Sequence, residues 1–296
     1  MKIKYQILLF YKYTYIDNPE SLANAQKDLC NKLNLKGRII FAKEGINATL
    51  EGLKIDTEKY IREMIADPRF ANVDFKKSAG TGHAFPKLSI KIREEIVSGH
   101  LKDLDVNPNQ ITGKYLSPDE LHDWIHSDKE FYIVDMRNDY EQAVGFFKNS
   151  ILSSLTNFRD LPKIIPQLLN LKDKTVVTVC TGGVRCEKAS GFLLKNGFSD
   201  VYQLYGGIVS YMEKYPNEDF LGKLYVFDSR VTVGFNTSSK DHKIVGKCTS
   251  CKNPADTYYD CKNTHCEGKR HFVSCDVCIR KQDEYCKDCM LCYMSL

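Results

Sequence analysis

Residues 174–195 read KTVVTVCTGGVRCEKASGFLLK, and this stretch decides the fold. The β-branched run from Lys174 to Thr178 is typical of a buried strand, and the segment from Glu187 to Lys195 predicts a helix. A cysteine and a glycine pair lie between the two elements. Backbone N–H groups in such a turn form an anion-binding concavity, and the helix N-terminus adds partial positive charge. The stretch therefore predicts an activated thiol inside an α/β domain.

Cys180 is the candidate nucleophile of this loop. Thiols near helix N-termini have pKa values lowered to about 3.5–7.5, which favours the thiolate at neutral pH. The alternative is a small buried cysteine that follows a core strand. The glycine pair and Arg185 favour the catalytic interpretation. The backbone of the intervening residues would form the anion cradle: Thr181, Gly182, Gly183 and Val184.

The composition is that of a globular protein with two modest domains and an appendage. The chain has 296 residues, of which 43% are hydrophobic and 27% charged. A net charge of +4 permits contact with a polyanion without demanding it. The apolar runs are too short to span a membrane, and the first residues lack a signal-peptide cleavage site. We therefore expect a cytoplasmic protein that does not contact a membrane.

Residues 1–97 alternate between strand and helix patterns. Strand patterns cover 5–11, 38–42 and 46–51, and a fourth begins at Val73. Helix patterns run from Asn18 to about Gly37 and from Asp56 to about Ile65. The order β-α-β-β-α-β predicts a ferredoxin-like α+β domain. Residues 88–93 add an edge strand.

Basic residues gather late in this first domain: Lys76, Lys77, Lys87, Lys91 and Arg93. They would suit contacts to a phosphate backbone. A solvated basic edge that blocks strand pairing is equally consistent with the pattern. The spacing does not decide between these two hypotheses.

Residues 98–116 have little periodicity and are expected to form a linker. Residues 117–218 then predict a central α/β domain with a parallel sheet, because strands 131–135, 174–178 and 201–204 alternate with helices. Ser117 should cap the first helix, and 161–171 should form another. Ligands of such sheets bind at the carboxyl ends of the strands, where Asp135, Arg137 and Cys180 fall.

After an expected linker over 219–247, residues 248–296 form a cysteine-rich segment. Nine of the twelve cysteines lie between Cys248 and Cys292. Without a secretory signal, pairs at Cys-x-x-Cys spacing indicate reduced thiols and structural zinc. The simplest first zinc site is Cys248, Cys251, Cys275 and Cys278; a second would use Cys261, Cys266, Cys286 and Cys289, with Cys292 or a histidine as possible substitutes. A disordered or disulfide-linked tail is the alternative.

These motifs carry a family resemblance. Asp135-x-Arg137 with Glu141, the six-residue Cys180–Arg185 loop and the Gly206-Gly207-Ile208 turn resemble a rhodanese domain. With the front domain and the cysteine-rich tail, the whole chain is similar to the rhodanese-containing tRNA uridine hydroxylases. The resemblance implies oxygen-dependent conversion of wobble uridine 34 to 5-hydroxyuridine, with the tRNA anticodon loop as partner. Molecular oxygen would be the co-substrate, and no organic cofactor is expected for the chemistry.

The resemblance also suggests roles for single residues. The phosphatase relatives have one more residue in the loop, so the six-residue form implies that Cys180 carries a persulfide. Arg185 would supply charge or fix the loop through a carboxylate, for which Asp135 is one candidate; a purely structural ion pair is the alternative. Cys186 would be a resolving thiol or a buried cysteine, and we favour burial.

Two other functions remain open at this point. The first is a sulfurtransferase that carries a cysteine persulfide, for which a sulfur-donor protein is a candidate partner. The second is a scaffold without catalysis, in which the cysteine-rich segment binds RNA or protein. The presence of both Cys180 and Arg185 argues against the scaffold.

Overall fold

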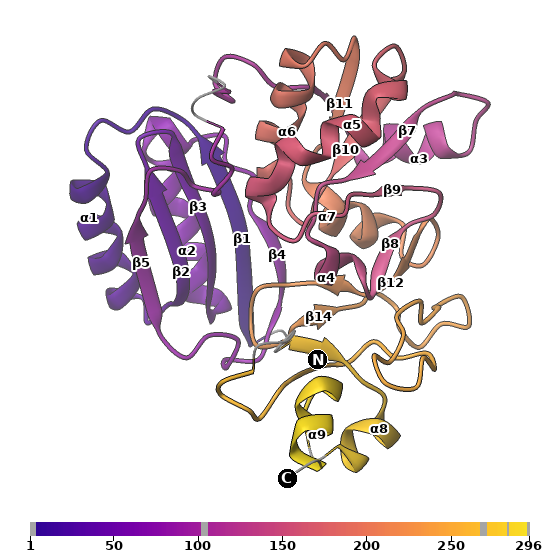
Figure 1. Cartoon of the computed structure of the whole chain (residues 1–296). Coiled ribbons are helices and arrows are strands. Elements are labelled where there is room, and N and C mark those ends of the chain that lie inside the picture. Colours follow the sequence, from indigo (N-terminus) through magenta and orange to yellow (C-terminus); the bar gives the residue numbers. More distant parts are fainter. Residues whose placement is uncertain (1–3, 102–105, 267–270, 283, 295–296) are drawn as a thin grey trace.

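A computed structural model describes residues 4–101, 106–266, 271–282 and 284–294 (Figure 1). Its front domain has the predicted element order, which confirms the ferredoxin-like fold. The elements are β1 (Tyr5–Tyr13), α1 (Pro19–Lys32), β2 (Lys36–Ala42), β3 (Gly45–Leu53), α2 (Lys54–Ile65), a 3-10 turn (Pro68–Phe70), β4 (Lys76–Gly80) and β5 (Leu88–Ile92). The strands lie in the order β4-β1-β3-β2-β5, with β5 parallel to β2 at the edge.

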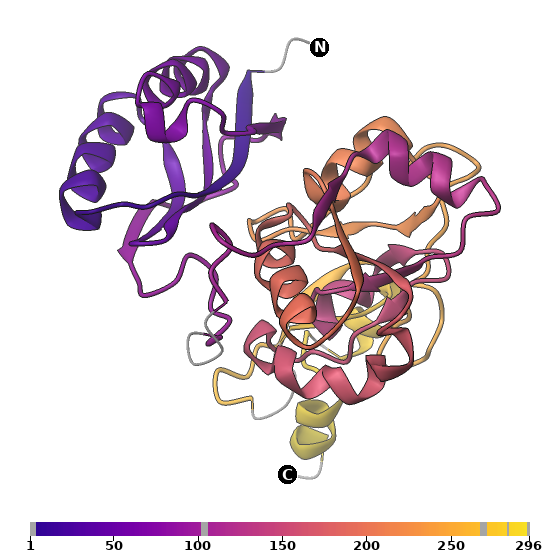
Figure 2. The same cartoon turned by 90° about the horizontal axis from the view of Figure 1, so that it is seen from above.

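The two helices cover one face of this sheet and leave the other open. Along β1, Leu8 and Phe10 pack in the core with Tyr60 of α2. Alternation along the strand therefore turns Leu9 and Tyr11 to the opposite face. Figure 2 shows that this open face is turned toward the rest of the chain.

The central domain contains a five-stranded parallel sheet in the order β6-β11-β10-β7-β9. Its strands are β6 (Lys114–Leu116), β7 (Tyr132–Asp135), β9 (Ile151–Leu152), β10 (Thr175–Val179) and β11 (Asp200–Leu204), and its helices include α3 (Pro118–Ile125), α4 (Asp139–Gln142), α6 (Val184–Lys195) and α7 (Gly207–Lys214). Val176 packs into the core beneath α6, whereas Val177 and Val179 pack against α7. The sheet is thus buried on both faces, as the near-continuous apolar strands predict.

Short strands and helices complete the chain. They are β8 (Gly145–Phe147), β12 (Phe220–Gly222), β13 (Leu224–Tyr225), β14 (Thr232–Val233), β15 (Tyr258–Asp260), β16 (His271–Val273), α8 (Asp276–Lys281) and α9 (Lys287–Met294). Strand β12 pairs with β8 of the central domain. Among the described residues, every helix is too short or too polar to cross a bilayer.

Several predicted boundaries differ from the structure. The fourth strand begins at Lys76 and not at Val73. Pro162 and Pro166 divide the expected helix over 161–171, since proline lacks the N–H that a helix interior needs. The segment folds as 3-10 turns (Phe158–Ile164 and Leu169–Leu171) flanking α5 (Ile165–Leu168). Both expected linkers contain strands, β6 in the first and β12 to β14 in the second.

The open face of the front sheet is docked on the first turns of α6. Lys188 is 1% exposed, and its Nζ lies 2.9 Å from carboxylate oxygens of both Glu44 and Glu95. Tyr13 donates a hydrogen bond of 3.2 Å to the carbonyl oxygen of Val184. These contacts tie the front domain directly to the helix that follows the cysteine loop.

Replacing Lys188 with Met should therefore destabilise the protein. Two carboxylates would lose their buried cation, and breaking a buried ion pair costs about 3–5 kcal/mol. Urea unfolding followed by circular dichroism measures this loss. Lys163→Met is the control, because Lys163 pairs with Asp160 at the surface, and such pairs contribute at most about 1 kcal/mol. Equal stability of the two variants would contradict the proposed importance of this contact.

Candidate active site

Cys180 lies at the end of β10, immediately before the loop that leads into α6. Its side chain is fully buried, and the N–H of Gly183 donates to Sγ at 3.2 Å. Gly183 has φ = 100°, a left-handed conformation that favours glycine and turns this N–H inward. The loop thus holds the sulfur at a helix N-terminus, as the sequence predicts.

The surroundings of Cys180 favour its thiolate. Burial acts to raise the pKa, but it is outweighed by a hydrogen bond from the Cys186 thiol, the charge of Arg185 and the backbone N–H groups of both residues. The pKa of Cys180 is lowered from 9.0 to about 6. Cys180 is therefore ionised at neutral pH and is the strongest nucleophile of the loop.

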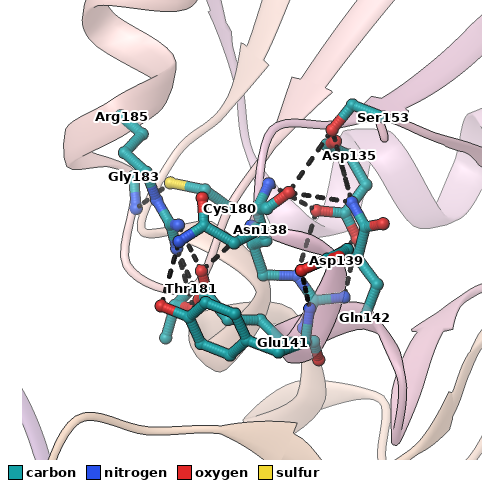
Figure 3. A network of polar contacts seen from close by, with 12 residues as sticks. Asp135, Asn138, Asp139, Glu141, Gln142, Ser153, Cys180, Thr181, Gly183 and Arg185 are labelled. Atoms are coloured by element: carbon teal, nitrogen blue, oxygen red, sulfur yellow. Dashed lines mark hydrogen bonds and ion pairs between the residues drawn. The ribbon is translucent and has the colours of Figure 1, made fainter. Parts of the chain in front are cut away.

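Arg185 is held by Glu141, a residue of α4. The guanidinium makes two hydrogen bonds to this carboxylate, of 2.5 and 2.8 Å, and Glu141 is fully buried (Figure 3). Burial would raise the pKa of Glu141, but the Arg185 charge holds it below the usual range. The suggestion that Asp135 fixes Arg185 is therefore wrong, since Glu141 makes the two-pronged contact.

Asp135 and Arg137 form a separate buried pair. The Arg137 Nη2 atom lies 2.6 Å from Asp135 Oδ2 and donates to the Gly145 carbonyl at 2.7 Å. A further bond of 3.3 Å reaches the carbonyl of Glu141. The pair thus holds the short α4 turn from which Glu141 reaches Arg185, and it supports the loop without touching Cys180.

The front domain covers the cysteine loop. A Cβ atom on Gly182 would lie 3.0 Å from Leu9 Cδ2, and one on Gly183 would lie 2.8 Å from Tyr11 Oη. The adjacent turn is equally close, because a Cβ on Gly207 would lie 2.7 Å from the Cys180 carbonyl oxygen. The loop therefore needs glycine at 182 and 183, where the front domain packs, and the adjacent turn needs glycine at 207, where it packs on the loop.

A cavity of about 790 Å³ lies between the open sheet face and the central domain. Cys180, Thr181, Gly182, Val184 and Arg185 line it on one side. Its basic lining residues are Arg38, Lys76, Lys77, Arg93, Arg159 and Arg230, together with Arg185. The basic surface that the sequence predicts on the front domain contributes Lys76, Lys77 and Arg93 to this lining. Its other two members, Lys87 and Lys91, are not among the lining residues. Arg38 was missed, although it alternates outward on its strand beside Ile39.

Eight cysteines of the C-terminal segment form two groups of four. Cys248, Cys251, Cys275 and Cys278 make the first group; Cys261, Cys266, Cys286 and Cys289 make the second. Within each group the sulfur atoms all lie within 4.8 Å of one another. These are the two sets that the spacing predicts, and either could hold a metal ion. The side chain of Cys292 lies outside the described residues.

Cys186 is fully buried on the first turn of α6. Burial and the neighbouring Cys180 raise its pKa well above the ordinary value. Its thiol stays protonated and donates to Cys180, which fits the expected buried cysteine better than a second nucleophile.

Three family models match successive parts of the chain. The UPF0176 acylphosphatase-like domain matches residues 5–96, the rhodanese-like domain 117–214, and the Rhodanase C-terminal model 221–292. A tRNA uridine(34) hydroxylase of Staphylococcus carnosus is 44% identical over 96% of this chain and 89% of its own length. The protein of that name from Bacillus licheniformis is 45% identical over 90% of this chain and 82% of its own length. The one from Cytophaga hutchinsonii is 42% identical over 98% of this chain and 90% of its own length.

Removing the Arg185–Glu141 pair should raise the pKa of Cys180 from about 6 toward 9.0, because the thiolate loses the stabilising charge of Arg185. The double variant Arg185→Met/Glu141→Gln avoids leaving a buried unpaired carboxylate. The pH dependence of iodoacetamide alkylation, followed on the Cys180 peptide by mass spectrometry, measures this pKa. Arg159→Met is the control, since it removes a cavity charge outside the loop. An unshifted profile in the double variant would show that Arg185 does not activate Cys180.

Proposed function

The chain belongs to the family of tRNA uridine(34) hydroxylases, and we propose that it performs this reaction in the cavity beside Cys180. One observation carries the assignment of the site: a thiol with a pKa of about 6 lies on the wall of a cavity with seven basic lining residues. The cavity volume of about 790 Å³ is sufficient for a nucleotide that has left its stack. The product is 5-hydroxyuridine.

Cys180 acts on the pyrimidine ring as a nucleophile. Addition of its sulfur to carbon 6 makes carbon 5 electron-rich, and carbon 5 then takes one atom of molecular oxygen, the proposed co-substrate. The second oxygen atom leaves as water, with two electrons and two protons supplied by an external thiol pair that becomes a disulfide. The reacting sulfur is that of the thiolate or of a persulfide on Cys180. Loop N–H groups such as that of Gly183 stabilise the sulfur anion in either form.

The anticodon loop reaches this site along the exposed arginines of the cavity wall. Arg38 and Arg93 are exposed on the front domain, and Arg159 is exposed on the central domain. Charges on two domains on either side of one cavity suit a backbone that passes between them while one base turns inward. The front domain thus contributes both phosphate contacts and the cover over Cys180.

A sulfurtransferase activity is the second candidate, because the same cradle would stabilise a persulfide that is passed to another acceptor. A sulfur-donor protein would then be a partner. Thiocyanate production from thiosulfate and cyanide at a substantial rate would favour this function.

The two cysteine groups suit structural zinc. Tetrahedral zinc with four bonds of about 2.3 Å to sulfur places the sulfur atoms about 3.8 Å apart. Sγ of Cys251 lies 3.7 Å from Sγ of Cys275, and Sγ of Cys266 lies 3.6 Å from Sγ of Cys286. Four cysteines per ion leave no position for a substrate, so zinc would stabilise the C-terminal segment. Thiolates of this kind suit a reducing compartment, and we propose the cytoplasm.

Deleting the gene should remove 5-hydroxyuridine and modifications derived from it from cellular tRNA, and Cys180→Ala should fail to restore them. The physical reason is that alanine cannot add to the ring. Nucleoside mass spectrometry of tRNA from the deletion strain, complemented with either form, measures the outcome. Cys30→Ala is the control, because Cys30 lies in the core of the front domain. Unchanged 5-hydroxyuridine in the deletion strain would reject the function.

Protein purified without chelator should contain two zinc ions per chain. Cys251→Ser and Cys266→Ser should each lose one ion, because each removes a ligand from a different group. Metal analysis by mass spectrometry counts the ions, and limited proteolysis reports the folding of residues 248–296. A folded C-terminal segment without metal would contradict the assignment, because so few apolar residues cannot form a core alone.

A further inference from the structure

Glu187 is a buried carboxylate beside the cysteine loop whose side-chain partners, in the described part of the chain, are all uncharged. Its side chain is on the first turn of α6, and the residue is 4% exposed. It accepts hydrogen bonds from four donors: Tyr11 Oη at 2.9 Å, Tyr115 Oη at 3.0 Å, Thr112 Oγ1 at 2.9 Å and Gln203 Nε2 at 3.1 Å. A buried charge without a cation is costly, so this arrangement points to a function.

The other buried carboxylates around the loop and cavity are already neutralised. Glu141 binds Arg185, Glu95 binds Lys188 and Asp228 binds Arg230. An anion paired with a cation in this way is a weak acceptor of a proton. Glu187 differs from these three in that, within the described residues, hydrogen-bond donors and no cation contact its carboxylate.

Tyr11 connects Glu187 to the cavity. It lines the cavity together with Cys180, and its hydroxyl lies 2.8 Å from the position of a Cβ on Gly183, the residue that donates to the Cys180 sulfur. Burial, followed by the charge of Glu187, raises the pKa of Tyr11 well above its ordinary value, so its hydroxyl carries a proton at neutral pH. On the far side of Glu187, Tyr115 is 53% exposed and opens the path to solvent.

We propose that Tyr11, Glu187 and Tyr115 form a proton relay that removes the hydrogen of carbon 5 from the substrate uracil. This inference rests on the proposed function. When the sulfur adduct carries oxygen on carbon 5, the C5–H bond breaks and its electron pair re-forms the ring double bond as the sulfur leaves. The proton passes to Tyr11 Oη while Tyr11 gives its own proton to Glu187. Tyr115 then turns its O–H to solvent, releases its proton to water and takes the one from Glu187.

The relay explains why the active site needs the front domain. The first acceptor, Tyr11, comes from β1, whereas the sulfur, Glu187 and Tyr115 come from the central domain and the strand that enters it. Tyr13 supplies a matched comparison on the same strand. It is buried and donates to the Val184 carbonyl of the same loop, so it contributes to docking without bonding to Glu187.

The test is single-turnover hydroxylation of tRNA with uridine 34 carrying hydrogen or deuterium on carbon 5. Tyr11→Phe should slow the reaction at least about 100-fold, the lower end of the range for loss of acid–base catalysis. It should also increase the deuterium isotope effect over that of the wild type, because removal of the C5 hydrogen becomes rate-limiting. Glu187→Gln should behave alike, and Tyr115→Phe should change the isotope effect in the same direction. Tyr13→Phe should react with the wild-type isotope effect.

Alkylation of Cys180 and tRNA affinity, measured on the same variants, show whether the site is intact. A wild-type rate for Tyr11→Phe would overturn the relay. A slow Tyr11→Phe reaction without an increased isotope effect would also overturn it, because Tyr11 would then only position the loop. If the wild-type protein forms no 5-hydroxyuridine, the proposed function itself fails, which is distinguishable from failure of the relay.

Discussion

The close approach of the front sheet to the Gly182–Gly183 turn is the contact on which the active site depends. Leu9 and Tyr11 lie where side chains on these glycines would have to be. The same turn directs an N–H group at the sulfur of Cys180. The Gly182–Gly183 turn therefore has two roles. Its backbone stabilises the Cys180 thiolate, and its lack of side chains lets the front domain pack against it. Any side chain at Gly183 would meet both a strained φ and the Tyr11 hydroxyl.

Around this contact the charges of the site are ordered in pairs. Arg185 is fixed by Glu141, and the α4 turn that carries Glu141 is fixed by Arg137. Lys188, three residues after Arg185, binds two carboxylates of the front domain. One helix, α6, thus supplies the activating cation of the thiol, the anchor of the front domain and the uncompensated Glu187. The rhodanese loop provides an activated thiol, and the docked front domain forms the other wall of the cavity beside it.

Local patterns predicted the parts of the molecule that depend on local sequence. The strand before Cys180, the Ser117 cap and the two groups of four cysteines follow from short-range periodicity and spacing. Both domain folds follow from the alternation of strands and helices. Prolines in the segment 161–171 were the local signal that should have corrected the helix prediction there.

Contacts between distant elements were not predictable in this way. Glu141 lies 44 residues before Arg185 and replaces Asp135 as its partner, because the α4 turn brings it back to the loop. Tyr11 lies 176 residues before Glu187 and reaches it through domain docking. Hydrophobic periodicity shows that the Tyr11 side chain points away from the core of the front domain, but it does not show which residues of the central domain this side chain contacts.

Cross-linking of the substrate base tests the central claim most directly, namely that uridine 34 enters the cavity between the front sheet and the Cys180 loop. A tRNA with 4-thiouridine at position 34 is irradiated in complex with the protein, and the cross-linked peptides are identified by mass spectrometry. The account predicts cross-links to β1 and to the loop over residues 180–185, the two opposite walls of the cavity. Cross-links confined to surfaces outside the cavity, such as the C-terminal helices, would contradict it.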